Sequence, residues 1–151
     1  MKALARASAW LRIAAVIAAL YAAGHTAGRP WTPTHDGLAQ GVVVGMREVH
    51  FSALGTTRSY WEFYQGFGLA LSVLLAMEAV LLWQLAAVAR AGTAYRAMTV
   101  THLVGFLVLG AVASRFIFAL PLWLSLAIAA CLAVALSRPQ SREATAGPRA
   151  T

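Results

Sequence analysis

Long apolar runs alternate with short polar segments along the chain, and this pattern is its main organising feature. Four runs are long enough to cross a bilayer, since a spanning helix needs roughly 20 mainly apolar residues. The predicted helices cover about residues 8–27, 60–88, 97–114 and 120–137. The sequence therefore predicts an all-α membrane protein, an antiparallel four-transmembrane-helix bundle in a single domain over residues 1–137.

The second predicted helix carries recognisable signals at both of its ends. Ser59 is followed three residues later by Glu62, a capping-box pattern that starts a helix near Tyr60. Aromatic residues gather at this end, as they do where helices cross a membrane interface. This aromatic belt consists of Tyr60, Trp61, Phe63 and Tyr64. Trp83 marks the approach to the opposite interface.

The first apolar run has two interpretations. Basic residues precede a short apolar core, and Ala22-Ala23-Gly24 is a passable cleavage site, which is the form of a cleavable signal peptide. The alternative is a retained first helix whose Arg12 extends to the inner headgroups. We favour the retained helix, because Gly24 and Gly28 form a GxxxG pair that lets a neighbouring helix pack closely.

The connection over residues 28–59 is the only sizeable segment outside the predicted bundle. Prolines and Gly37 make its first part a loop. Apolar residues at spacings of four, four and three then form one stripe of a short helix, expected to lie in or against the outer interface over Leu38–Phe51. The stripe consists of Leu38, Val42, Met46 and Val49. At the other end of the chain, residues 138–151 are polar and small, and we expect a disordered cytoplasmic tail.

Composition supports a membrane location and argues against a nucleic-acid partner. Hydrophobic residues make up 60% of the chain and charged residues 11%, whereas soluble domains carry about 25% charged residues. The 12 basic residues sit mainly where apolar runs end, so membrane lipids are the expected partners. Eight of these residues fall on the side of the termini and four on the other: Arg29, Arg47, Arg58 and Arg115. This bias predicts both termini in the cytoplasm and a multi-pass protein of the bacterial inner membrane.

Metal and cofactor chemistry receive no support from the sequence. Cys131 is the only cysteine, which rules out an internal disulfide and a CxxC motif. The four histidines lack metal-ligand spacing, and the chain has no nucleotide-binding glycine motif. No cofactor and no metal are therefore predicted.

Glu78 and His102 are the first candidate catalytic residues. Glu78 lies about 24 Å along its helix from Glu62, well inside the hydrocarbon, and we expect it to face the bundle interior. His102, on the next helix, is its natural partner. The two could form a proton-accepting pair or one end of a ligand pocket; alternatively, a neutral Glu78 forms a structural hydrogen bond across helices.

A second candidate group gathers at the outer ends of the helices. Glu62 with His25 could move a proton, while Arg115 holds an anionic group. The structural alternative makes Glu62 only the capping acid and Arg115 an interfacial anchor or the partner of Glu62. The further candidates for ligand binding in this layer are Gln65, Tyr64, Arg58 and His50, with His35 nearby in the connection.

Two short segments carry a family resemblance. RSYWEFYQGFGL at Arg58–Leu69 and the pair Gly24–His25 resemble small four-helix bacterial inner-membrane proteins, broadly DoxX-like, over about residues 8–137. Most of that group lack an assigned function. A more distant similarity of plan exists with four-helix sterol-isomerase-like domains, which place acids and a histidine inside a bundle. Because Glu62 and Glu78 point to different sides of their helix, no catalytic residues are carried over.

Three functions are compatible with this sequence. The first is a non-catalytic module that binds lipid, another membrane protein or a second copy of itself. The second is a membrane enzyme that acts on an isoprenoid, sterol-like molecule or quinone by proton transfer through Glu and His. The third is a small proton-coupled transporter that works as an oligomer.

Overall fold

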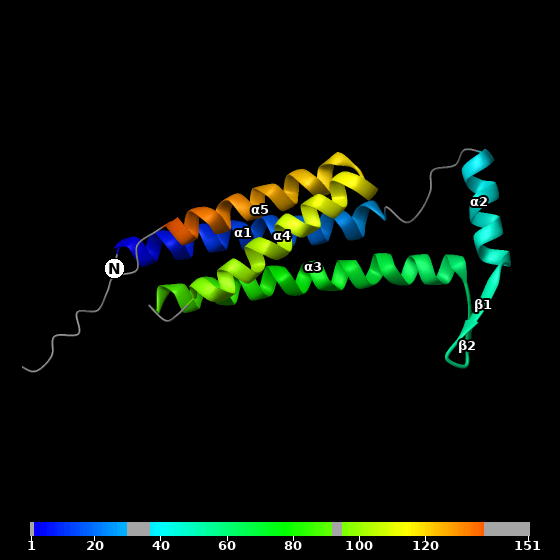
Figure 1. Ribbon diagram of the computed structural model, residues 1–151, viewed down its shortest axis with the longest axis horizontal. Helices are drawn as coiled ribbons and strands as arrows, with labels where there is room; N and C mark the ends of the chain where they lie inside the picture. The colour runs from blue at the N-terminus through cyan, green and yellow to red at the C-terminus, as the bar shows by residue number, and fades with distance from the viewer. Residues whose placement is uncertain (1, 30–36, 92–94, 138–151) are drawn as a thin grey trace, which may run out of the picture. The chain divides into compact units, whose positions relative to one another are not determined.

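A computed structural model describes residues 2–29, 37–91 and 95–137 of the chain, which form helices and one β-hairpin (Figure 1). The elements in chain order are α1 (Lys2–Gly28), α2 (Gly37–Glu48), β1 (His50–Ala53), β2 (Thr56–Ser59), α3 (Tyr60–Arg90), α4 (Arg96–Phe116) and α5 (Ala119–Ser137). His35 and the tail over residues 138–151 lie outside the described residues, so the predictions for them stay predictions.

Four of the helices, α1, α3, α4 and α5, are long and apolar enough to cross a membrane. This confirms the four predicted helices of spanning length, and the chain is compatible with a multi-pass membrane protein. The largest difference in bounds is at α1, which begins at Lys2 rather than near residue 8. Ala, Leu and Arg are strong helix formers, so the basic start of the chain continues the helix toward the N-terminus.

The chain divides into two compact units, and the first consists of residues 1–18 and 79–151. In it, α4 and α5 pack against each other. A side chain at Gly110 of α4 would come 3.5 Å from the β-carbon of Ser125, so glycine allows this close approach. Arg96 at the start of α4 donates a hydrogen bond of 2.7 Å to the carbonyl of Leu136 near the end of α5.

The same unit joins the first part of α1 to the last part of α3. The Ser8 hydroxyl donates to the Ala86 carbonyl at 2.7 Å, and both residues are fully buried. The guanidinium carbon of Arg12 lies 5.0 Å from the centre of the Trp83 ring, a cation–π contact. Alanines on both helices are buried around these contacts: Ala7, Ala14, Ala15, Ala18, Ala79, Ala86 and Ala89.

Close packing of α1 therefore involves its alanines rather than the predicted GxxxG pair. A β-carbon added to Gly24 or Gly28 would meet no atom within 4 Å among the residues that the structure describes. Both glycines lie in the last turns of α1, where the helix is mostly exposed. The close packing expected at the GxxxG pair is therefore not seen among the described residues, and the choice between a retained helix and a signal peptide stays a prediction.

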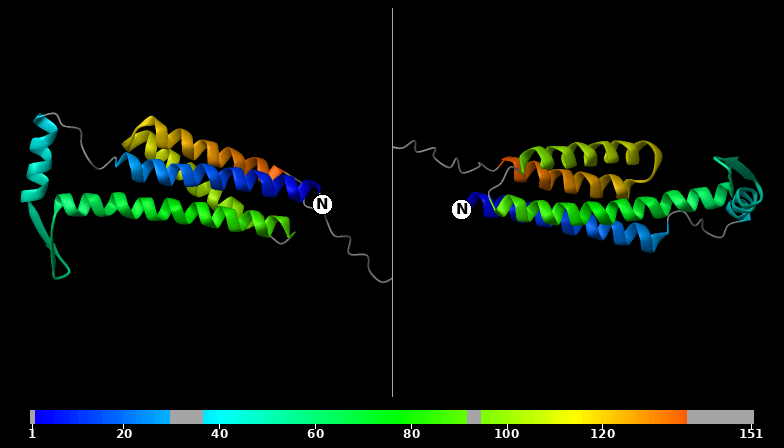
Figure 2. Two further views of the ribbon diagram at one scale, coloured as in Figure 1. Left: turned by 180° about the vertical axis from the view of Figure 1, so that it is seen from behind. Right: turned by 90° about the horizontal axis from the view of Figure 1, so that it is seen from below.

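The second unit, residues 19–78, contains the end of α1, α2, the hairpin and the start of α3. Figure 2 shows α2 and the hairpin from two further sides, with α2 lying across the direction of α3. α2 buries none of its residues, and Leu38 is 90% exposed. No residue of this stripe within α2 is buried by the protein, and the predicted contact of the stripe with the outer membrane interface stays a prediction.

The hairpin corrects the predicted helix over Leu38–Phe51. The helix ends at Glu48, and Phe51 belongs to β1, which pairs antiparallel with β2. The two turn residues, Leu54 and Gly55, have φ values of 51° and 77°. Two consecutive left-handed residues allow the tight two-residue turn that matches strand twist, so the chain folds back on itself instead of continuing the helix.

Candidate functional site

A groove with a volume of about 350 Å³ lies at the start of α3, in the second unit. Its lining consists of Arg58 from β2 and Glu62, Phe63, Gly66, Phe67 and Ala70 from α3. The α3 residues recur at helical spacing and so share one face of the helix. The groove therefore runs along α3, from a charged end near the hairpin to an apolar end further along the helix.

A ladder of aromatic rings attaches the hairpin to this end of α3. The ring of Phe51 in β1 lies 5.1 Å from that of Tyr60 and 5.3 Å from that of Phe63, between centres. Phe63 in turn makes an edge-to-face contact with Phe67 at 4.8 Å. Such pairs contribute beyond the area they bury, so the hairpin is held against the helix by Phe51.

The strand register explains why Arg58 reaches the groove. Phe51 and Arg58 are direct partners across the hairpin, so their side chains lie on the same face. Because Phe51 packs on α3, that face is the one toward the helix. The Arg58 guanidinium donates one hydrogen bond, of 3.1 Å, to the Thr57 carbonyl. Ser52 and Thr57 on the opposite face share a hydrogen bond of 2.8 Å.

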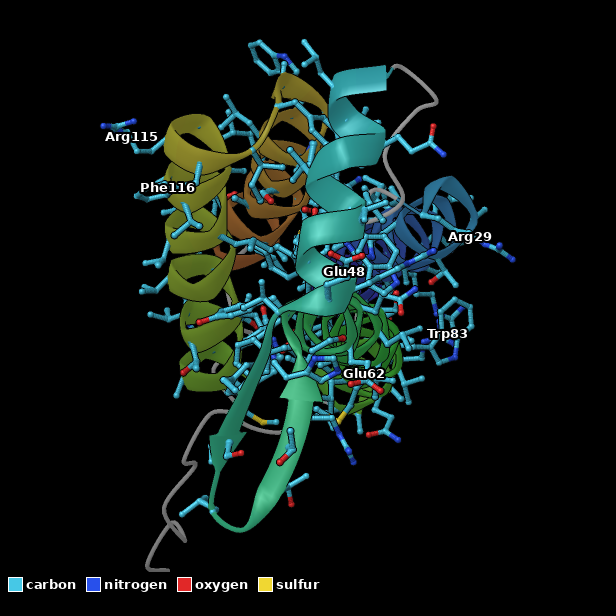
Figure 3. The ribbon with its side chains drawn as sticks, turned by 90° about the vertical axis from the view of Figure 1, so that its right-hand side faces the viewer. Arg29, Glu48, Glu62, Trp83, Arg115 and Phe116 are labelled. Atoms are coloured by element: carbon cyan, nitrogen blue, oxygen red, sulfur yellow. The ribbon has the colours of Figure 1, made fainter. Side chains whose placement is uncertain are left out.

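Glu62 combines a structural contact with its place in the groove lining. The Ser59 backbone N–H donates to Glu62 Oε2 at 2.9 Å, and the Glu62 backbone N–H donates to Ser59 Oγ at 3.1 Å. These reciprocal bonds confirm the predicted capping box. Figure 3 shows Glu62 beside the first turn of α3, where β2 leads into the helix. The second carboxylate oxygen is available for a ligand, because the cap engages Oε2.

Gly66 makes the groove hollow. A β-carbon added there would meet no atom within 4 Å among the described residues, so any larger side chain would enter the groove itself. Phe63 and Phe67 flank the glycine along the helix, and both are more than half exposed. From Phe63 to Ala70 the apolar floor extends about 10 Å along α3.

A second polar arrangement lies deeper in the same unit. His25 Nδ1 is 3.1 Å from Ser72 Oγ, and the Ser72 hydroxyl is 3.2 Å from the Gly68 carbonyl. A carbonyl only accepts, so the serine proton points to Gly68 and the serine oxygen accepts from His25. In this arrangement His25 donates from Nδ1. Ser72 follows Glu62 by about 15 Å of helix rise, so the His25–Glu62 proton pair stays a prediction.

The intramembrane pair Glu78 and His102 also stays a prediction. Glu78 is half-buried and adjoins the buried residues Leu75, Ala79 and Leu82 of α3. His102 is half-buried in α4. Glu78 belongs to the second unit and His102 to the first, and each unit is described by itself.

The remaining outer candidates do not all belong to one unit. Arg115 is in the first, and Figure 3 shows its side chain pointing away from the end of α4, with the Phe116 ring 5.5 Å away. In the second unit, His50 contacts the Glu48 carbonyl at 2.8 Å and Tyr64 stacks near Trp61 at 6.2 Å. Gln65 is half-buried on α3. A single pocket for these residues stays a prediction.

The groove contains two predicted candidates, Arg58 and Glu62, and four residues that the sequence analysis did not assign to a site. Phe63 and Phe67 are four residues apart with Gly66 between them, which signals an aromatic face with a gap. That spacing could have indicated the floor. In contrast, the cation–π contact of Arg47 with Trp61, 5.3 Å from guanidinium carbon to ring centre, depends on how α2 packs and has no sequence signal.

Neither possible metal-ligating side chains nor similarity to known proteins adds to this description of the site. Within residues 2–29, 37–91 and 95–137, no three His, Cys, Asp or Glu side chains lie together so as to hold a metal ion. Comparison of the chain with known protein families, with curated proteins and with solved structures finds no match.

Proposed function

We propose that this is a multi-pass protein of the bacterial inner membrane that binds a membrane lipid, without catalysis, in the groove at the start of α3. The observation that carries the proposal is the division of the groove into a charged end, with Arg58 and Glu62, and an apolar floor from Phe63 to Ala70. A membrane lipid has the same division between headgroup and acyl chain. Apolar pockets with a few placed polar groups are typical ligand sites.

The depth of the groove along α3 supports this assignment. Trp83 and the Arg12 guanidinium that contacts it suit the inner interface, where aromatic and basic residues gather. Roughly 20 residues cross about 30 Å of hydrocarbon, and counting that far back from Trp83 reaches Phe63. Arg58 and Glu62 would then lie at headgroup level, and the floor beyond Phe63 at the level of the acyl chains.

The orientation of the groove follows from the proposed topology. In an antiparallel bundle of four helices with both termini in the cytoplasm, α3 begins on the outer side. The basic residues support this orientation, since it would put eight of them on the cytoplasmic side and four outside. The occupant would therefore be a lipid of the outer leaflet. The DoxX-like resemblance, the membrane enzyme and the transporter stay predictions, because no contact described above favours them.

Filling the groove tests the proposal. Gly66→Leu places a side chain in the groove from a position where its β-carbon meets no described atom within 4 Å, and it replaces a helix-weakening glycine. We expect Gly66→Leu to lose at least about tenfold in lipid affinity, while its free energy of unfolding stays equal or rises by about 0.5–1 kcal/mol. Native mass spectrometry of the protein released from nanodiscs measures the bound lipid, and thermal unfolding measures stability.

Gly105→Leu is the matched control for this experiment. An added β-carbon at Gly105 also meets no atom within 4 Å in the described part of the chain, and Gly105 does not line the groove. The control should retain wild-type lipid binding. Equal lipid binding by the Gly66→Leu variant and wild type would overturn the proposal.

A further inference from the structure

We propose that the groove selects a phospholipid whose headgroup carries both a phosphate and a primary ammonium, with Arg58 binding the phosphate and Glu62 the ammonium. This inference rests on the proposed lipid-binding function and names the class of lipid. It comes from the presence of one cation and one anion at the same end of an apolar groove.

Arg58 has the chemistry to bind a phosphate. A guanidinium offers five N–H donors in a planar fork that matches two phosphate oxygens. The hydrogen bond from Arg58 to the Thr57 carbonyl uses one of these donors and anchors the side chain. The pairing of Arg58 opposite Phe51, which packs on α3, keeps the guanidinium at the groove.

Glu62 has the chemistry to bind an ammonium group. Its Oε2 atom accepts the hydrogen bond from the Ser59 backbone, which fixes the carboxylate at the groove end. The other carboxylate oxygen can accept an N–H from a primary ammonium, a charge-assisted hydrogen bond. A quaternary ammonium has no N–H to donate, so it would bind less well than a primary one.

The charges also discriminate against anionic headgroups. Arg58 and Glu62 together contribute no net charge, so in the groove lining the cation is matched by an anion and does not by itself favour a net-anionic lipid. A headgroup with a phosphate alone would satisfy Arg58 but leave its negative charge near the Glu62 carboxylate. Selectivity of this kind comes from a repulsive group as well as an attractive one. A lipid bound the other way round, with its acyl chain at the charged end of the groove, would bury both Arg58 and Glu62 in hydrocarbon.

Competition between defined lipids tests the inference. Wild-type protein in nanodiscs that contain phosphatidylethanolamine, phosphatidylglycerol and phosphatidylcholine at equal mole fractions should retain phosphatidylethanolamine about tenfold better than phosphatidylglycerol, the ratio expected for one charge-assisted contact. Glu62→Gln should abolish this preference. Glutamine also serves as the third residue of a capping box, so the helix start is preserved while the charge is removed.

Two further variants separate headgroup recognition from general effects. Glu48→Gln makes the same change at an exposed carboxylate outside the groove and should keep the wild-type preference. Arg58→Gln should weaken all three phospholipids, since it removes the phosphate contact, whereas Arg115→Gln should not. Thermal unfolding of each variant confirms that it is folded.

The outcomes distinguish the two proposals. Saturable binding by the wild type with no preference between the zwitterionic and anionic lipids, or a preference that survives Glu62→Gln, would overturn headgroup selection and leave lipid binding intact. A groove that holds no lipid of any class, or that is covered by a second copy in a dimer, would overturn both.

Discussion

Glu62 has both a structural role and a role in the proposed function. Its carboxylate holds the first turn of α3 through Ser59 and also lines the groove. The capping function was predictable, because a serine followed three residues later by a glutamate just before an apolar run is a local signal. The groove was not, since it depends on how the hairpin places Phe51 of β1 and Arg58 of β2 against α3.

Removal of the serine hydroxyl should weaken the start of α3. In Ser59→Ala the Glu62 backbone N–H loses its acceptor, and loss of such a cap costs about 1 kcal/mol of the free energy of unfolding. Thermal or denaturant unfolding in a mild detergent measures the change. Glu62→Gln, which keeps the reciprocal bond, should unfold like the wild type; equal stability of Ser59→Ala and wild type would contradict the structural role of the cap.

The partner of His25 illustrates the limit of prediction at this scale. The sequence suggested Glu62, because both residues are near the outer ends of their helices. The imidazole contacts Ser72, 47 residues away in the chain, and the pairing with Glu62 stays a prediction. Such a contact depends on the side-by-side register of α1 and α3 in the second unit, and a hydroxyl in an apolar helix has no distinctive signal of its own.

At the scale of elements, the helices were predictable and the hairpin was not. Apolar runs of spanning length specify helices wherever water is absent, because only internal hydrogen bonds satisfy the backbone there. The ends of α3, α4 and α5 differ from prediction by two residues or fewer. The hairpin was missed because its turn is Leu54-Gly55 rather than the usual Asn-Gly, so residues 52–57 read as a plain connection.

Leu54 therefore offers a way to strengthen the hairpin. Its side chain is fully exposed and its φ is 51°, a left-handed conformation that costs about 1–2 kcal/mol for most residues. Asparagine tolerates this conformation, so Leu54→Asn should stabilise the hairpin locally by about 1 kcal/mol. Hydrogen exchange of the strand amides should slow up to about fivefold.

Leu54→Ala is the control for this prediction. It removes an exposed side chain that buries nothing and keeps the cost of the left-handed backbone, so the exchange rates should match those of the wild type. An asparagine variant that exchanges as fast as the alanine variant would show that turn strain does not limit hairpin stability.

At the scale of the whole molecule, the proposed topology can be tested by labelling. In a Cys131→Ser background, Thr57→Cys lies in β2 and Ala91→Cys just beyond α3, and both positions are exposed. With both termini in the cytoplasm, a membrane-impermeant maleimide should label Thr57→Cys in intact spheroplasts and Ala91→Cys only after lysis. The reverse labelling pattern would show the opposite topology, with both termini outside and the groove in the inner leaflet.

The number of helices of spanning length could be predicted at this scale, whereas the side on which the basic residues lie stays a prediction. The arrangement of the ionisable groups could not be predicted. Glu78 and His102 were predicted to be partners because both are rare polar residues in apolar helices. Which neighbours they meet depends on helix rotation, and apolar helices with small residues can pack in several rotations at similar free energy.

The length of α3 has a consequence for how the protein would respond to the membrane around it. Its 31 residues extend about 46 Å, well beyond the roughly 30 Å that hydrocarbon requires. Counted back from Trp83, the surplus turns are the first residues, Tyr60–Glu62, which lie next to Arg58, and the residues that follow Trp83. In a bilayer of shorter acyl chains these turns would emerge further, and in a thicker one they would sink. Membrane thickness would thus set the height of the groove relative to the phosphates and, with it, the occupancy of the site.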